Sequence, residues 1–315
     1  MKKTLLALAV VAASGAAFAQ SATLSGSYVF GYQSTKVGGV TTAGIGTDTA
    51  AIKLVATEDL GGGLKATAQV SLGGMMRDGA GTGEDARLVL SGGFGSLLLG
   101  TVESDDGLSR AYAGAPVIGL DGKVHGGNAN IDVLGYTSPQ LAPGLTVGVS
   151  YVDRGTAGAT GLAAGTTGAA AAQPSVTGNV QYKAGPIDAR FDVTSWTRQG
   201  ATGVASNTTK NRFRVSGNYN LGVAKVGLGY SQLKRTTGIS TKQLEAGVSA
   251  SFGATTVGAV YEQLQNTGAA KKSGFTVGAQ YDLSKRTNVS AGYATWKTAG
   301  ASSDTSFRVL VGHSF

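Results

Sequence analysis

The chain has 315 residues, with 51 glycines, five prolines, no cysteine and a formal net charge of +8 at pH 7. Without cysteine an exported domain cannot depend on disulfides, so an extended hydrogen-bond network or a large core must stabilise it. The cations are dispersed along the chain and lack the basic and aromatic clustering of a nucleic-acid site, so we expect no nucleic-acid partner.

The first nineteen residues have the order of a secretory signal. Lys2 and Lys3 precede an apolar stretch over residues 4–13, and Ala17-Phe18-Ala19 forms a small-x-small cleavage site. The apolar run is too short to span a membrane, which disfavours a membrane anchor. We predict a signal peptide at residues 1–19 and one exported domain at residues 20–315. Subtracting the two signal lysines from +8 leaves a formal charge of +6.

Short stretches of alternating apolar and polar residues follow from residue 22 to the end, as in FTVGAQYD at residues 275–282. Side chains of a strand alternate between its two faces, so each stretch predicts a strand with one apolar and one polar face. We predict about sixteen strands, joined alternately by tight glycine-containing turns and longer loops. The predicted turns lie at residues 59–63, 93–95, 140–144, 185–186, 221–222, 253–254 and 283–286. The predicted loops lie at residues 34–49, 74–84, 103–130, 154–173 and 198–209, with shorter ones near 235, 265 and 298.

The polar faces of these strands carry charge. Asp188, Arg190 and Asp192 alternate with Phe191 and other apolar residues. A buried unpaired ion costs several kcal/mol, so the charged faces need water. An antiparallel transmembrane β-barrel with lipid outside and water inside therefore fits better than a soluble sandwich, and its short turns would be periplasmic and its long loops extracellular. Aromatic residues near strand ends suit an interfacial girdle, although aromatics also favour strands generally; they are Tyr32, Tyr151, Tyr182, Tyr219, Tyr281 and Phe315.

Several segments carry a resemblance to a known family. They are TEDLGGGLKA at residues 57–66, LSGGFGSL at 90–97, DLSKRT at 282–287 followed by AGY at 291–293, and the terminal strand at 307–315. In this order they resemble the general porins of Gram-negative outer membranes, especially the beta-proteobacterial trimeric porins. The resemblance implies a sixteen-stranded barrel, a homotrimer in outer-membrane lipid and lipopolysaccharide, and a third loop folded into the lumen. It also implies that Phe315 helps the outer-membrane assembly machinery to recognise the chain.

The chain departs from this family at three basic positions. Relatives commonly carry arginine in the strand before the first turn, where Ala51 and Val55 stand here with Lys53 nearby. Thr101 follows a Leu-Gly pair, and residues 135–139 read GYTSP, where relatives often carry arginine. The family's arginine cluster is therefore incomplete, and the sign of any ion preference stays open at this stage.

The loop at residues 103–130 is the candidate constriction. We expect its carboxylates to face basic residues of the wall, giving a transverse field that orients hydrated solutes. The alternative is that these are ordinary solvated charges. The loop residues are Glu103, Asp105, Asp106, Arg110, Asp121, Lys123 and His125, and the wall residues are Lys53, Arg87, Arg190, Arg212, Arg214 and Arg308.

An enzyme is disfavoured because His125 and His313 are the two histidines and neither has the sequence context of a general base. No cysteine–histidine metal cluster, EF-hand or phosphate-binding loop is present in the sequence, so we expect no cofactor. Trp196 and Trp296 fall on polar faces near loop ends and are interpreted as rim residues. We predict a passive channel for small hydrophilic solutes and ions, weakly anion-selective if the cations prevail. The alternatives are a substrate-selective porin and a closed structural or adhesive barrel.

Overall fold

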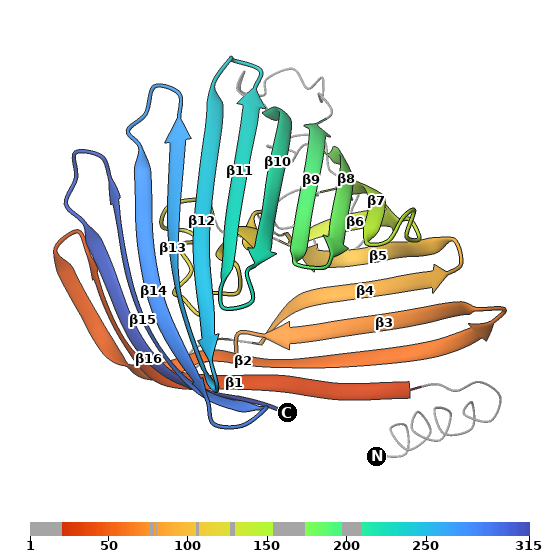
Figure 1. Ribbon diagram of the computed structural model, residues 1–315, viewed down its shortest axis with the longest axis horizontal. Helices are drawn as coiled ribbons and strands as arrows, with labels where there is room; N and C mark the ends of the chain where they lie inside the picture. The colour runs from red at the N-terminus through yellow and green to blue at the C-terminus, as the bar shows by residue number, and fades with distance from the viewer. Residues whose placement is uncertain are drawn as a thin grey trace.

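The computed structural model describes residues 21–75, 79, 81–104, 107–126, 130–153, 174–196 and 209–315. Over these residues the chain forms sixteen antiparallel strands in one closed barrel, in which each strand pairs with its neighbours in sequence and β16 pairs with β1 (Figure 1). The predicted fold class is confirmed. The predicted signal peptide, the predicted loop at 154–173 and nearly all of the loop at 198–209 lie outside the described residues.

The strands range from eight to 22 residues. Within the described residues, no helix is long and apolar enough to cross a membrane. The strands are β1 (Ser21–Val37), β2 (Val40–Gly61), β3 (Leu64–Gly73), β4 (Thr82–Gly92), β5 (Gly95–Glu103), β6 (Asn130–Thr137), β7 (Leu145–Asp153), β8 (Ser175–Ala184), β9 (Ile187–Trp196), β10 (Thr209–Asn220), β11 (Lys225–Arg235), β12 (Ser240–Phe252), β13 (Thr255–Asn266), β14 (Lys272–Asp282), β15 (Thr287–Thr298) and β16 (Asp304–Ser314).

The first hairpin corrects one prediction. Residues 34–49 were expected to form a loop, but β1 and β2 continue through them and pair as far as Val37 and Val40. Gly38 and Gly39 form the connecting turn with φ angles of 58° and 87°. Positive φ at both central residues is the geometry of a two-residue hairpin turn that matches strand twist, and glycine adopts it without strain. The glycine and threonine content that suggested a loop therefore belongs to a long, solvent-exposed hairpin.

The two faces of the barrel follow the predicted parity. Side chains on the apolar faces are exposed on the outside of the barrel, among them Leu24, Tyr28, Phe191, Val215 and Phe307. The aromatic residues proposed for the girdle are exposed there too, at 40–52% of their maximum. The opposite faces carry buried polar side chains, including Asp192, Thr194, Ser216, Glu245 and Glu262. The interior is thus polar and the exterior apolar, the reverse of a soluble protein and the arrangement that lipid requires.

The C-terminal residue completes the seam between the first and last strands. The N–H of Phe315 donates to the Gly26 carbonyl at 3.0 Å, and the N–H of Gly26 donates to the Phe315 carbonyl at the same distance. The ring of Phe315 occupies the space that a side chain at position 26 would need. Glycine at position 26 therefore allows the terminal ring to pack closely against β1.

The third loop, between β5 and β6, runs inside the barrel (yellow in Figure 1). Among its described residues the loop contains one 3₁₀ turn, η1 (Ser109–Tyr112), which packs against β10, β11 and β12. The strands beneath this loop present glycine to it. A Cβ added at Gly227 would lie 2.5 Å from the Ala111 carbonyl oxygen, and one at Gly274 would lie 2.6 Å from the Leu120 side chain. The close approach of loop and wall is possible because these positions lack side chains.

Candidate pore constriction

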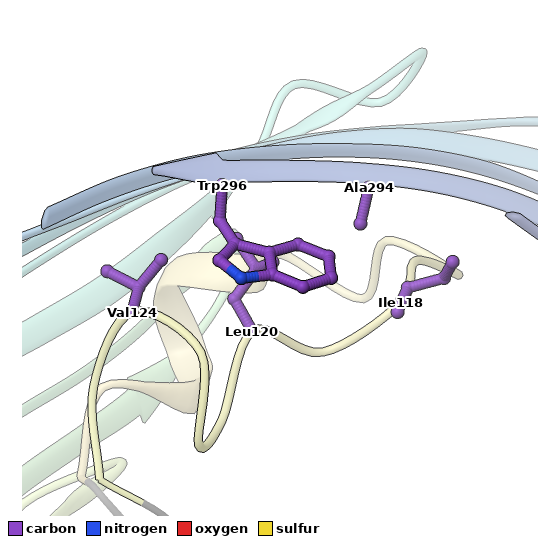
Figure 2. Close-up of a cluster of buried hydrophobic side chains, with 5 residues drawn as sticks. All are labelled: Ile118, Leu120, Val124, Ala294 and Trp296. Carbon is purple, nitrogen blue, oxygen red and sulfur yellow. The ribbon is translucent and has the colours of Figure 1, made fainter. Parts of the chain in front are cut away.

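A small hydrophobic cluster fixes the C-terminal half of the third loop to the wall. Ile118, Leu120 and Val124 of the loop pack on Ala294 and Trp296 of β15 (Figure 2). Leu120 and Val124 are almost fully buried, and Trp296 is 9% exposed. Trp296 was interpreted as a rim residue, and that interpretation is wrong: it lies on the inner wall, covered by the loop. The sequence placed Trp296 on the inner face, but it did not predict that the third loop packs against this side chain.

Polar contacts fix the N-terminal half of the third loop. Ser216 Oγ donates to the Gly107 carbonyl at 2.9 Å, and Ser249 Oγ donates to the Ala113 carbonyl at 2.5 Å. Arg110 Nε donates to Asp188 Oδ1 at 2.7 Å in an ion pair between the loop and β9. The wall hydroxyls thus donate hydrogen bonds to loop carbonyls, and the wall carboxylate pairs with the loop arginine. Without these contacts the loop groups would depend on water in the lumen for their hydrogen bonds.

A buried acid–histidine cluster lies where the loop crosses β12 and β13. Glu245 and Glu262 are direct cross-strand partners, and both are fully buried. His125 Nε2 lies 2.9 Å from Glu262 Oε2 and 3.8 Å from Glu245 Oε1, and the Tyr112 hydroxyl donates to Glu262 Oε1. The sequence did not predict this cluster, because its members lie far apart in the chain.

Electrostatics at this cluster favour a cation on the loop side. Burial would lower the pKa of His125, but the adjacent Glu262 and the charges of Glu245 and Asp121 outweigh it and raise the pKa to about 9. Burial and the same two glutamates raise the pKa of Tyr112 above its ordinary value, so its hydroxyl stays neutral. Burial lowers the pKa of Lys123, and the charge of Arg308 adds to that effect against the opposing charge of Asp121.

Beside the loop, the lumen contains a hollow of about 640 Å³ with two unlike walls. Strands β5 to β7 contribute apolar side chains such as Leu98, Val102 and Val133. The neighbouring part of the wall, beyond β8, is basic and is formed by β9, β10 and β11; its lining cations are Arg190, Arg212, Arg214 and Arg235. Trp196, also interpreted as a rim residue, ends β9 and lines this hollow, with the Arg212 guanidinium 5.4 Å from its ring centroid.

A buried carboxylate organises this basic wall. Asp192 Oδ1 accepts from Arg214 Nε at 2.9 Å, and Asp192 Oδ2 lies 3.3 Å from Arg190 Nε. Asp192 is fully buried and does not line the hollow. It therefore holds two guanidinium groups in place while leaving the lining itself with an excess of positive charge.

The remaining predicted wall residues lie elsewhere around the barrel. Arg87 Nη2 donates to Gln69 Oε1 at 2.7 Å, and Arg308 Nη1 pairs with Asp48 Oδ1 at 3.4 Å. Lys53 is exposed on β2. These three residues belong to β2, β4 and β16, so the structure separates them from the arginines of β9 and β10.

The predicted loop charges are dispersed as well. Glu103 is exposed at the end of β5, where its N–H donates to Asp85 Oδ1 at 3.0 Å. Asp121 Oδ1 lies 3.4 Å from His125 Nδ1, and Lys123 Nζ donates to the Gly119 carbonyl at 3.0 Å. Asp105 and Asp106 lie outside the described residues.

In the described ion pairs between loop and wall, the positive and negative partners are the reverse of those expected. Loop carboxylates were expected to face wall cations, but Arg110 of the loop pairs with Asp188 of the wall, and His125 of the loop pairs with Glu262. The reason is that the loop covers strands whose inner faces carry acids, while the arginine wall faces the open hollow. Apart from His125, which belongs to both groups, the charges that anchor the loop are therefore distinct from the charges that line the hollow.

Comparisons with known proteins agree with this architecture. The family model described as Gram-negative porin matches residues 5–301. Outer membrane porin protein 32 of Delftia acidovorans is 31% identical over 343 aligned residues, covering 96% of this chain and 91% of that protein. The anion-selective porin from Comamonas acidovorans has 25% identity and a TM-score of 0.73 over 94% of this chain and all of that chain.

The trimer form of OmpT from Vibrio cholerae matches with a TM-score of 0.72 over 94% of this chain and all of that chain; at 15% identity it supports the fold alone. Porins are channels rather than enzymes, and neither a closed adhesive barrel nor a site for one chosen substrate is favoured by these relatives. The chain belongs to the Gram-negative porin family and forms a channel in the bacterial outer membrane.

Proposed function

We propose that this porin lets small hydrophilic solutes and ions diffuse passively and prefers anions. The observation that carries the proposal is the lining of the hollow, which contains four arginines and one described acidic side chain, that of Glu103 at the end of β5. Fixed positive charge in a narrow aqueous passage raises the local concentration of anions and repels cations. Arg235, which the sequence reasoning did not select, adds to this wall and offsets the arginines missing from residues 51–55, from position 101 and from residues 135–139.

Relatives lend support to this preference. The structure from Comamonas acidovorans is described as an anion-selective porin and shares 25% identity with this chain. We further propose that the chain works as a homotrimer embedded in outer-membrane lipid and lipopolysaccharide, in keeping with the resemblance of its turn segments and terminal strand to the beta-proteobacterial trimeric porins.

The test of anion preference is the reversal potential of the refolded wild-type protein in a planar bilayer under a KCl gradient. We expect a reversal potential whose sign reports that chloride crosses more readily than potassium. The potential should lie further from zero at about 0.1 M salt than at about 1 M, because the electrostatic screening length falls from about 10 Å to about 3 Å. A potential of cation sign would overturn the proposed preference. Absence of current from folded protein would overturn the open channel itself.

We also propose that Phe315 is read by the outer-membrane assembly machinery. Replacing it by alanine should lower the amount of assembled barrel in cells while leaving refolding in detergent almost unchanged, because the ring is half-exposed and both backbone hydrogen bonds to Gly26 survive. The amount of assembled barrel is measured by the heat-modifiable electrophoretic mobility of outer-membrane fractions. Refolding in detergent is measured by its yield. Phe307→Ala, another outward aromatic of β16, is the matched control; equal losses in both variants would reduce Phe315 to a girdle residue.

A further inference from the structure

We propose that His125, Glu245 and Glu262 form a binding site for a Zn²⁺ ion that joins the third loop to the barrel wall. The three side chains offer one nitrogen and two carboxylate oxygens, all within 4.8 Å of one another. The proposal concerns the loop anchor and does not depend on the ion preference of the pore.

The first step is the charge of the glutamate pair. Glu245 and Glu262 face each other directly across β12 and β13 with side chains 0% exposed. Like charges in direct cross-strand register are destabilising, and each buried ion carries a desolvation cost of several kcal/mol. Two of their described donors are neutral: Gln243 Nε2 donates to Glu245 at 2.6 Å, and the Tyr112 hydroxyl donates to Glu262. Protonated His125 offsets one of these two charges, and a divalent cation in place of its proton would offset both.

The second step is the orientation of His125, whose side chain is 3% exposed. Its Nδ1 lies 3.1 Å from the Gly126 carbonyl oxygen and 3.4 Å from Asp121 Oδ1. Nε2 is directed toward the two glutamates, and zinc would displace its proton while the proton on Nδ1 stays in place. A carbonyl or carboxylate on one ring nitrogen and a free lone pair on the other is the arrangement that metal-binding histidines adopt.

The third step is the geometry between the ligand atoms. His125 Nε2 and Glu262 Oε2 are 2.9 Å apart and form an ion pair when the ring is protonated, and a bound metal ion would take the place of the proton between them. Tetrahedral zinc with bonds of 2.0–2.1 Å holds its ligand atoms about 3.3 Å from one another. The distances from His125 Nε2 to the two carboxylates, 2.9 and 3.8 Å, bracket this value. Three protein ligands leave a fourth position for water.

The fourth step is the identity and access of the ion. An imidazole ligand favours zinc over calcium and magnesium, which take oxygen ligands. Two carboxylates balance the two charges of Zn²⁺, whereas a protonated histidine would balance only one of them. The aqueous hollow is lined in part by His125, Gly126 and Gln243, so a hydrated ion has a route to the site.

The test is metal analysis of the refolded full-length porin after chelator treatment, zinc addition and dialysis. We expect about one tightly held zinc ion per chain, absent from His125→Ala and from Glu262→Gln. His313→Ala is the matched control, because His313 is the second histidine of the chain and is exposed on β16. Wild-type protein without zinc, or equal zinc in wild type and His125→Ala, would overturn the site.

A second measurement requires no substitution. Amide hydrogen exchange of wild-type protein should slow at Lys123 and Val124, whose N–H groups bond to the Leu120 carbonyl at 3.0 and 2.9 Å, when zinc is added. Magnesium at the same concentration should leave their exchange unchanged. Asp121→Asn should weaken zinc binding by about tenfold, since it removes the charge behind His125 without removing a ligand. Exchange that is unaltered by saturating zinc would overturn the proposal even if the variants misfold.

Discussion

Replacing Arg212 and Arg235 together by glutamate should reverse the ion preference of the pore, seen as a change in sign of the reversal potential under a KCl gradient. Both side chains line the hollow on its basic wall. The double substitution removes two positive charges and introduces two negative ones, while Arg190 and Arg214 remain paired with Asp192. Since Glu103 is the acidic side chain of the described lining, the variant lining would carry three carboxylates against two arginines that are already neutralised in part.

The matched control for this prediction is a charge reversal far from the hollow. Lys285→Glu in the turn between β14 and β15 makes the same kind of change outside the lumen. We expect it to leave the reversal potential almost unchanged, because at about 0.1 M salt the screening length is about 10 Å. A double variant that folds and keeps the wild-type sign would show that charges other than the arginine wall determine selectivity. The difference between variants should shrink at about 1 M salt, where screening is about 3 Å.

The sequence predicted the barrel well because its signal is local. The alternation of FTVGAQYD at residues 275–282 places Phe275 and Tyr281 outside and Thr276 inside, as the structure has them. Period two and tight turns are properties of neighbouring residues, so they can be read without knowing which strands pair. The same local reading was wrong at residues 34–49, where composition suggested a loop but cross-strand pairing extends a hairpin.

The anchor of the third loop could not be predicted, because it depends on register and on contacts distant in sequence. Glu245 and Glu262 become neighbours only when β12 pairs with β13 in one register, and a shift by one residue would place one of them on the lipid face. His125 comes from the third loop, a distant part of the chain, and contacts them where that loop packs on the wall. The inward glycines of β11 to β15 were visible in the sequence, but their meaning depends on the loop that lies on them.

Replacing Gly278 by valine should loosen the third loop more than any other single glycine change outside a turn. Gly278 lies on the inner face of β14, and a Cβ there would overlap the Pro116 carbonyl of the loop backbone, which cannot rotate away as a side chain can. Overpacking of this kind costs about 1–3 kcal/mol. Valine suits a strand, so the cost falls on loop docking and not on the barrel. The docking equilibrium should therefore shift by about 5- to 150-fold.

Hydrogen exchange measures that shift directly. The amides of Ala111 and Ala113, which bond to the Leu108 and Arg110 carbonyls at 2.7 and 3.1 Å, should exchange about 5- to 150-fold faster in the variant. Single-channel currents should become noisier and lower on average, since the wedge pushes the loop toward the pore axis. Gly46→Val on β2, where an added Cβ meets nothing within 4 Å, should change neither quantity. Equal loop exchange in the two variants would contradict the prediction. It would mean that the Trp296 cluster and the contacts of Ser216, Ser249 and Asp188 hold the loop in place despite the added side chain. The glycines would then be required only for assembly.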